Sequence, residues 1–201
     1  GTMYLVVIIL FIGGICLIGD HLTLLAITND LPFYGAIADN LTHLVCGSLT
    51  WMYIVLHTCT PSDLFQECLL SGCVASLVDI DHFLSARSFN LQLVLQLNKR
   101  PFLHCASSCA VVSYCLYHYG KRHGILWFRR VSLLVLVSWT SHLIRDGTRR
   151  GLWLFPYLST PPYNVHVYLG LMMMLPVIFR ILMARYGRDD NPSFPSKVLT
   201  I

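Results

Sequence analysis

The chain has 201 residues, of which 55% are hydrophobic and only 12% are charged, and its mean hydropathy is +0.62. Soluble domains carry about 25% charged residues, so this composition excludes an ordinary soluble enzyme and indicates an integral membrane protein. The formal net charge of +4 is spread over several segments without a nucleic-acid-binding motif, so we expect no nucleic-acid partner.

The first three apolar runs predict membrane helices at residues 3–19, 33–57 and 64–84. The first run lacks a positively charged start and a cleavage site, which favours a membrane helix over a signal peptide. The second run carries Asp39 and His43, four residues apart, within its first turns. The third run ends in Asp79, Asp81 and His82, of which Asp79 and His82 share a helical face.

Three more apolar runs follow, at 100–119, 131–151 and 165–184, after a polar stretch with a short interfacial helix at 89–97. Pro101 suits the first helical turn of the fourth run. Arg100 and His104 are four residues apart, so in a helix they would lie on one face. A basic loop is expected at 120–130. The sequence thus predicts an all-α, multi-pass bundle of about six membrane helices. Residues 1–184 form its single domain, and 185–201 form a flexible polar tail.

Alternating membrane crossings would bring the ionisable groups of five helices to one side of the bilayer. Asp20 ends the first run, the second begins with Asp39, the third ends near Asp79, the fourth begins with His104, and the fifth ends with Asp146. Opposite ends would lie about 30 Å apart, too far to share a ligand shell. A common polar rim is therefore expected.

Histidines and carboxylates gathered at one rim predict a divalent metal site. Each of these residues taken alone is better explained as an interfacial or hydrogen-bonded core residue, and it is their gathering that favours a metal. Mixed nitrogen and oxygen ligands suit zinc first, with manganese or iron as alternatives. We expect more than one ion, although some carboxylates can instead orient a histidine. The predicted ligands are Asp39, His43, Asp79, Asp81, His82, His104, His142 and Asp146.

Arginines flank the same rim, and they permit two interpretations. Arg145, Arg149 and Arg150 can simply mark a helix end or a cytoplasmic face. Alternatively, guanidinium groups beside metal ions suit a phosphate, because their paired donors match its oxygens. The eight cysteines include no Cys-x-x-Cys pair and lie mostly in apolar runs, so we expect them to pack as small hydrophobic residues.

Four motifs carry a family resemblance: DNLTH (39–43), DIDHF (79–83), RPFLH (100–104) and SHLIRDG (141–147). At these motifs the chain resembles the animal transmembrane protein 267 family over nearly its whole length. More remotely it resembles the YdjM-like predicted membrane-bound metal-dependent hydrolases. That pattern falls on Asp79, Asp81, His82, Arg100, His104, His142, Asp146, Gly151 and Pro156.

Two positions depart from the YdjM-like pattern: Lys99 replaces its usual histidine and Leu103 its usual threonine, so one ligand or its partner is missing. The larger family is similar to the helical zinc phospholipase C and P1 nuclease group. This similarity implies phosphoester hydrolysis by analogy of fold.

The sequence therefore predicts a membrane hydrolase that uses metal-activated water on a phosphoester, with a phospholipid head group as substrate. Asp81 is the predicted general base or bridging ligand, and Arg100 and Arg145 are predicted to hold the phosphate. The alternatives are a non-catalytic protein with a structural metal and an ion transporter, the latter disfavoured by the few polar groups elsewhere. A small excess of basic residues opposite the rim favours a lumenal or external site in an endomembrane.

Overall fold

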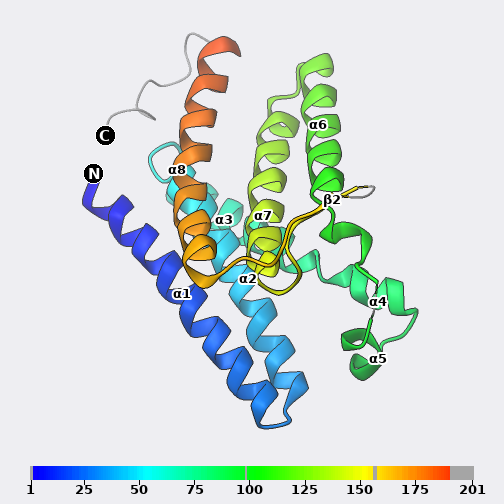
Figure 1. Cartoon of the computed structure of the whole chain (residues 1–201). Helices are drawn as coiled ribbons and strands as arrows, with labels where there is room; N and C mark the ends of the chain where they lie inside the picture. Colours follow the sequence, from blue (N-terminus) through cyan, green and yellow to red (C-terminus); the bar gives the residue numbers. More distant parts are fainter. Residues whose placement is uncertain (1, 98, 156–157, 191–201) are drawn as a thin grey trace.

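The computed structural model describes residues 2–97, 99–155 and 158–190 and shows a bundle of long helices (Figure 1). The long helices are α1 (Thr2–Thr28), α2 (Pro32–Val55), α3 (Pro61–Leu77), α6 (Ala106–His123), α7 (Leu126–Arg150) and α8 (Val165–Asp190). The shorter elements are α4 (Ile80–Ala86), α5 (Leu91–Leu95), the 3-10 helix η1 (Phe102–His104) and an antiparallel hairpin of β1 (Trp153–Leu154) and β2 (Leu158–Ser159). The expected all-α bundle is confirmed.

Three segments of the described chain are long and apolar enough to cross a membrane: Met3–Thr28, Pro61–Ala86 and Val165–Ala184. The second, Pro61–Ala86, combines α3 with α4. Helices α2 and α7 carry most of the ionisable residues of the predicted rim, which lowers their hydropathy. Membrane crossing by all six predicted runs therefore stays a prediction.

Helix α2 lies at the centre of the bundle and contacts α1, α3, α7 and α8 (Figure 1). Its crossing with α3 is close because both helices place glycine there. A Cβ on Gly47 would lie 2.7 Å from the Cβ of Ala75, and one on Gly72 would lie 2.6 Å from the carbonyl oxygen of Leu44. This near backbone contact fixes the end of α3, and hence Asp79, against α2.

The polar residues of the first two helices lie inside them, which differs from the expectation for α1 and agrees with the expectation that Asp39 lies within the first turns of α2. Helix α1 continues from Asp20 to Thr28, which adds about 12 Å at 1.5 Å per residue. Helix α2 begins at Pro32, two turns before Asp39. The α1–α2 hairpin therefore projects beyond the polar residues, as the lower end of both helices in Figure 1 shows.

The predicted third run is broken, which turns its acidic end inward. Helix α3 stops at Leu77, and a tight turn, with a hydrogen bond of 3.1 Å from the N–H of His82 to the carbonyl of Asp79, leads into α4. The predicted interfacial helix appears as α5. The predicted start of the fourth helix was wrong, because Pro101 is extended and α6 begins only at Ala106.

Two other boundaries differ from expectation. The predicted basic loop at 120–130 is mostly helical, since α6 ends at His123 and α7 begins at Leu126, with Gly124 in the left-handed conformation (φ +66°) between them. Helix α8 continues to Asp190, six residues past the predicted end of the domain at 184. The rest of the predicted tail, 191–201, lies outside the described residues, as does Pro156.

Candidate metal centre

All eight predicted ligands meet in one cluster, built from α2, the α3–α4 turn, η1 and the second half of α7. Three overlapping groups each have potential ligand atoms within 4.8 Å of one another; His104 belongs to two of them, and so does Asp146. The groups are Asp79 with His104, His142 and Asp146; Asp81 with His82 and His104; and Asp39 with His43 and Asp146.

The first group, which we call the metal set, consists of Asp79, His104, His142 and Asp146. The Nε2 atoms of His104 and His142 lie 3.2 Å apart. Asp146 Oδ2 lies 3.1 Å from His104 Nε2 and 3.4 Å from His142 Nε2, and Asp79 Oδ1 lies 3.5 Å from each. Four atoms that can donate a lone pair thus face one point.

These separations fit a tetrahedral cation. Zinc bonds of about 2.0–2.1 Å to nitrogen and oxygen place tetrahedral ligands about 3.3–3.4 Å apart. The five separations given above range from 3.1 to 3.5 Å. The donor set and these five separations therefore suit one divalent ion.

The two imidazoles of the metal set are oriented through their other nitrogens. His142 Nδ1 donates to the carbonyl of Ala75 at 2.8 Å, which leaves its Nε2 lone pair directed at the cluster. His104 Nδ1 donates to Asp81 Oδ2 at 3.4 Å in the same arrangement. His142 is fully buried, and its ring stacks on that of His43 with centroids 3.8 Å apart. Both rings are held as a metal ligand requires.

Asp81 thus lies behind His104, away from the cation position. Its side chain is buried, and it also accepts the backbone N–H of Leu103. These contacts favour an orienting role over the general base or bridging ligand expected from the sequence, because a base must reach the attacking water.

We expect Asp81→Asn to weaken zinc binding by about 10–100-fold without abolishing it, the usual effect of losing a partner that orients a ligand. The amide can still accept from His104 Nδ1, but without the negative charge. Competition with a chromogenic chelator measures the change, and Asp63→Asn, an exposed carboxylate at the far end of α3, is the control. Unchanged affinity in Asp81→Asn would contradict the orienting role.

The electrostatics of the metal set favour a cation. Burial by itself lowers the pKa of His104, but hydrogen bonds to Asp146, Asp79 and Asp81 outweigh it and raise the pKa to about 11. Without a metal, a proton on His104 therefore supplies the positive charge that these carboxylates require. A divalent ion can replace this proton, as metal ions do on binding to histidine.

His82 lies at the exposed side of the metal set. Its Nε2 is 3.3 Å from His104 Nε2 and 3.9 Å from Asp79 Oδ1. Its side chain is 27% exposed, in contrast to the buried His43 and His142. It can therefore contact both the cation position and the surrounding medium.

The arginines are already paired. Arg145 is buried and donates to Asp39 and, at 2.7 Å, to Asp20. Arg149 donates hydrogen bonds of 2.7 Å to both carboxylate oxygens of Asp39. Arg100 donates to the backbone carbonyls of residues 150 and 151 at the end of α7. These contacts argue against the phosphate-holding role expected for Arg100 and Arg145, because both terminal nitrogens of each guanidinium donate within the protein.

The sequence reasoning missed Asn40 and Ser76. Asn40 Nδ2 donates to Asp79 Oδ2 at 3.3 Å and to the carbonyl of Ser76 at 3.0 Å, while its carbonyl accepts from the Ser76 hydroxyl. This network holds Asp79 against α2. The presence of Asn40 next to Asp39 within an apolar run is the feature of the sequence that could have indicated this network.

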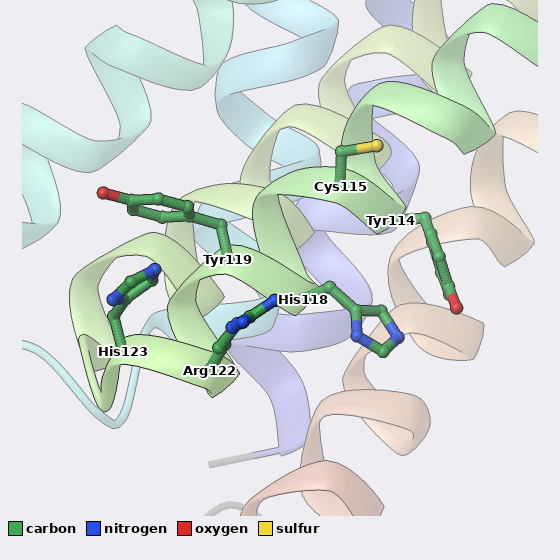
Figure 2. Close-up of a pocket in the computed structure, with 6 residues that line it drawn as sticks. All are labelled: Tyr114, Cys115, His118, Tyr119, Arg122 and His123. Atoms are coloured by element: carbon green, nitrogen blue, oxygen red, sulfur yellow. The ribbon is translucent and has the colours of Figure 1, made fainter.

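A surface hollow lies away from this cluster. It has a volume of about 530 Å³ and lies on the last turns of α6, and Figure 2 shows the side chains that line it. Its lining residues are Tyr114, Cys115, His118, Tyr119, Arg122 and His123. None of them is a predicted ligand. All eight cysteines are free thiols, and none belongs to the three ligand groups, which fits the expected packing role.

Comparison with known proteins identifies relatives in several vertebrates. The chain is 41% identical over 184 residues to "Transmembrane protein 267" of Mus musculus, an alignment that covers 90% of this chain and 84% of the relative. It is 36% identical to the protein of that name in Bos taurus (86% and 80% covered) and 31% identical to that in Danio rerio (89% and 80%). No protein-family model and no solved structure matches the chain.

Proposed function

We propose a function from the premise that this chain belongs to the transmembrane protein 267 family, and is therefore a membrane protein in contact with lipids. The metal set binds one divalent cation, zinc in preference to manganese or iron, and the protein hydrolyses an ester at that site. The observation that carries this proposal is the tetrahedral spacing of the two imidazoles and two carboxylates.

A cation held there would have four protein ligands, so water would bind it as a fifth ligand; the cation would lower the pKa of that water to supply a nucleophile at neutral pH, and it would polarise the ester. The protein residues do the rest. His104 and His142 are held in the tautomer that directs Nε2 inward, by Asp81 and by the Ala75 carbonyl respectively. His82, partly exposed beside Asp79, is positioned to accept the proton of the attacking water.

The surroundings of the site support a lipid substrate. The α1–α2 hairpin continues beyond Asp20 and Asp39, and the apolar side chains on this projection face outward. They include Leu24, Ile27, Leu31, Phe33 and Tyr34, each at least 46% exposed. Such a surface suits the bilayer, so a lipid ester can approach the metal set laterally.

The motif resemblance to the YdjM-like hydrolases supports ester hydrolysis and phosphoesters in particular. Because Arg145 and Arg149 are paired with carboxylates, the bound cation would contact the phosphate in place of these arginines. The protein crosses an internal membrane several times. Because basic residues are in slight excess on the opposite side, the metal set faces the lumen.

The test is a hydrolysis assay with protein purified in detergent, loaded with zinc and mixed with vesicles of phosphatidylcholine, phosphatidylethanolamine, phosphatidylserine or phosphatidic acid. We expect release of a phosphorylated head group, inorganic phosphate or fatty acid that stops when a chelator removes the metal. If protein with a full complement of metal turns over none of these lipids, the hydrolase proposal fails.

A second function, a purely structural metal site, rests on a different observation. The metal set already completes a tetrahedron with protein atoms alone, as structural zinc sites do, and it ties η1, α7 and the α3–α4 turn together. In this case metal removal would lower the melting temperature but no lipid would be hydrolysed.

A further inference from the structure

The third ligand group, Asp39 with His43 and Asp146, has the composition of a second metal site next to the metal set. Asp146 connects the two: its Oδ2 faces His104 and His142, while its Oδ1 faces His43 Nε2 at 3.4 Å. A carboxylate with its oxygens divided in this way is the usual bridge between two cations in binuclear sites.

In this chain, the second position contains part of a side chain. Arg145 Nη1 lies 3.0 Å from His43 Nε2 and donates to Asp39 Oδ1, so one guanidinium nitrogen contacts two of the three potential ligands. Arg145 is only 2% exposed, and Asp20 holds its other nitrogen. The guanidinium is therefore fixed among these ligands.

Two acceptors confirm that this position requires positive charge. His43 Nε2 faces a guanidinium, which can only donate, so Nε2 carries a lone pair and cannot donate to Asp146. Asp146 Oδ1 is buried and, among the described residues, makes no hydrogen bond. Two lone pairs 3.4 Å apart are tolerated only beside a cation.

We infer that the guanidinium of Arg145 takes the place of a second metal ion, so that the native centre holds one ion. Substitution of Arg145 by a neutral residue would then produce a two-ion centre. This inference rests on the proposed metal site. It replaces the sequence expectation of more than one ion by a single ion with a guanidinium neighbour. Arg149 is 47% exposed, and its Nη1 forms a longer ion pair of 3.6 Å with Asp146 Oδ1.

The test is the zinc-to-protein ratio of the wild-type chain, Arg145→Gln and Arg145→Lys, each purified in detergent, saturated with zinc and freed of excess metal. We expect about one, about two and about one ion per chain, because glutamine removes the charge whereas lysine keeps it. Circular dichroism and size-exclusion chromatography verify that each variant is folded.

The outcomes separate the two proposals. A wild-type ratio near two overturns the inference while the metal site stands, and it does so even if neither variant folds. A wild-type ratio of one with a folded Arg145→Gln that also binds one ion overturns it as well. A wild-type ratio near zero overturns the proposed function, and the inference with it.

Discussion

Asp146→Asn is expected to remove the metal, lowering the bound zinc from about one ion per chain to below about a tenth after dialysis against a weak chelator. The reason is the central position of this carboxylate. Of the two carboxylates, Asp146 lies closer to both imidazole nitrogens of the metal set, with its Oδ2 at 3.1 and 3.4 Å. An amide has nearly the same shape but contributes no negative charge, so two imidazoles and one carboxylate remain to bind a divalent ion.

Asp63→Asn is the matched control, because it makes the same substitution at an exposed carboxylate at the start of α3. It should bind as much zinc as the wild-type chain. Inductively coupled plasma mass spectrometry measures both ratios. A folded Asp146→Asn that retains a full equivalent of zinc would show that the metal lies elsewhere or is held by other residues.

His82→Asn is expected to reduce turnover by about 100- to 10,000-fold while the metal stays bound, the range typical for loss of a general base. His82 is the exposed imidazole of the cluster, and its Nε2 lies farther from Asp79 than those of His104 and His142 do. It thus lies beside the metal set and is not one of its four ligands.

The assay follows the initial rate of lipid hydrolysis, with zinc content measured on the same sample. His118→Asn, an exposed histidine on α6, is the control and should leave both quantities unchanged. If His82→Asn lost zinc in proportion to its activity, His82 would be a ligand. If it kept full activity, the proton would be accepted by another group.

Helical spacing predicted part of this centre well. His142 and Asp146 lie one turn apart on α7, and their side chains meet the same point, because that stretch is a regular helix. Asp79 also reaches the metal set as expected, although α3 ends before it. The gathering of all eight predicted ligands required that the segments carrying them meet on one side of the bundle, which the sequence could indicate, although Asp39 and His43 lie inside α2 and His104 lies in η1.

The roles within the cluster could not be predicted, since they depend on contacts between distant segments. The spacing of Arg100 and His104 implied a shared helical face, but Pro101 is extended and the two side chains separate. Nothing local reveals that Asp81 turns toward His104, 23 positions away, or that Arg145 reaches Asp20. Tertiary packing decides which charges pair, and thus which remain available to a ligand.

Zinc-edge X-ray absorption of the wild-type protein tests the central claim most directly, because it reports the atoms bound to the ion. The metal set predicts a shell of four nitrogen and oxygen atoms at about 2.0–2.1 Å with the outer-shell scattering of two imidazoles. A shell that contains sulfur at about 2.3 Å, or a protein that takes up no zinc at all, would contradict it.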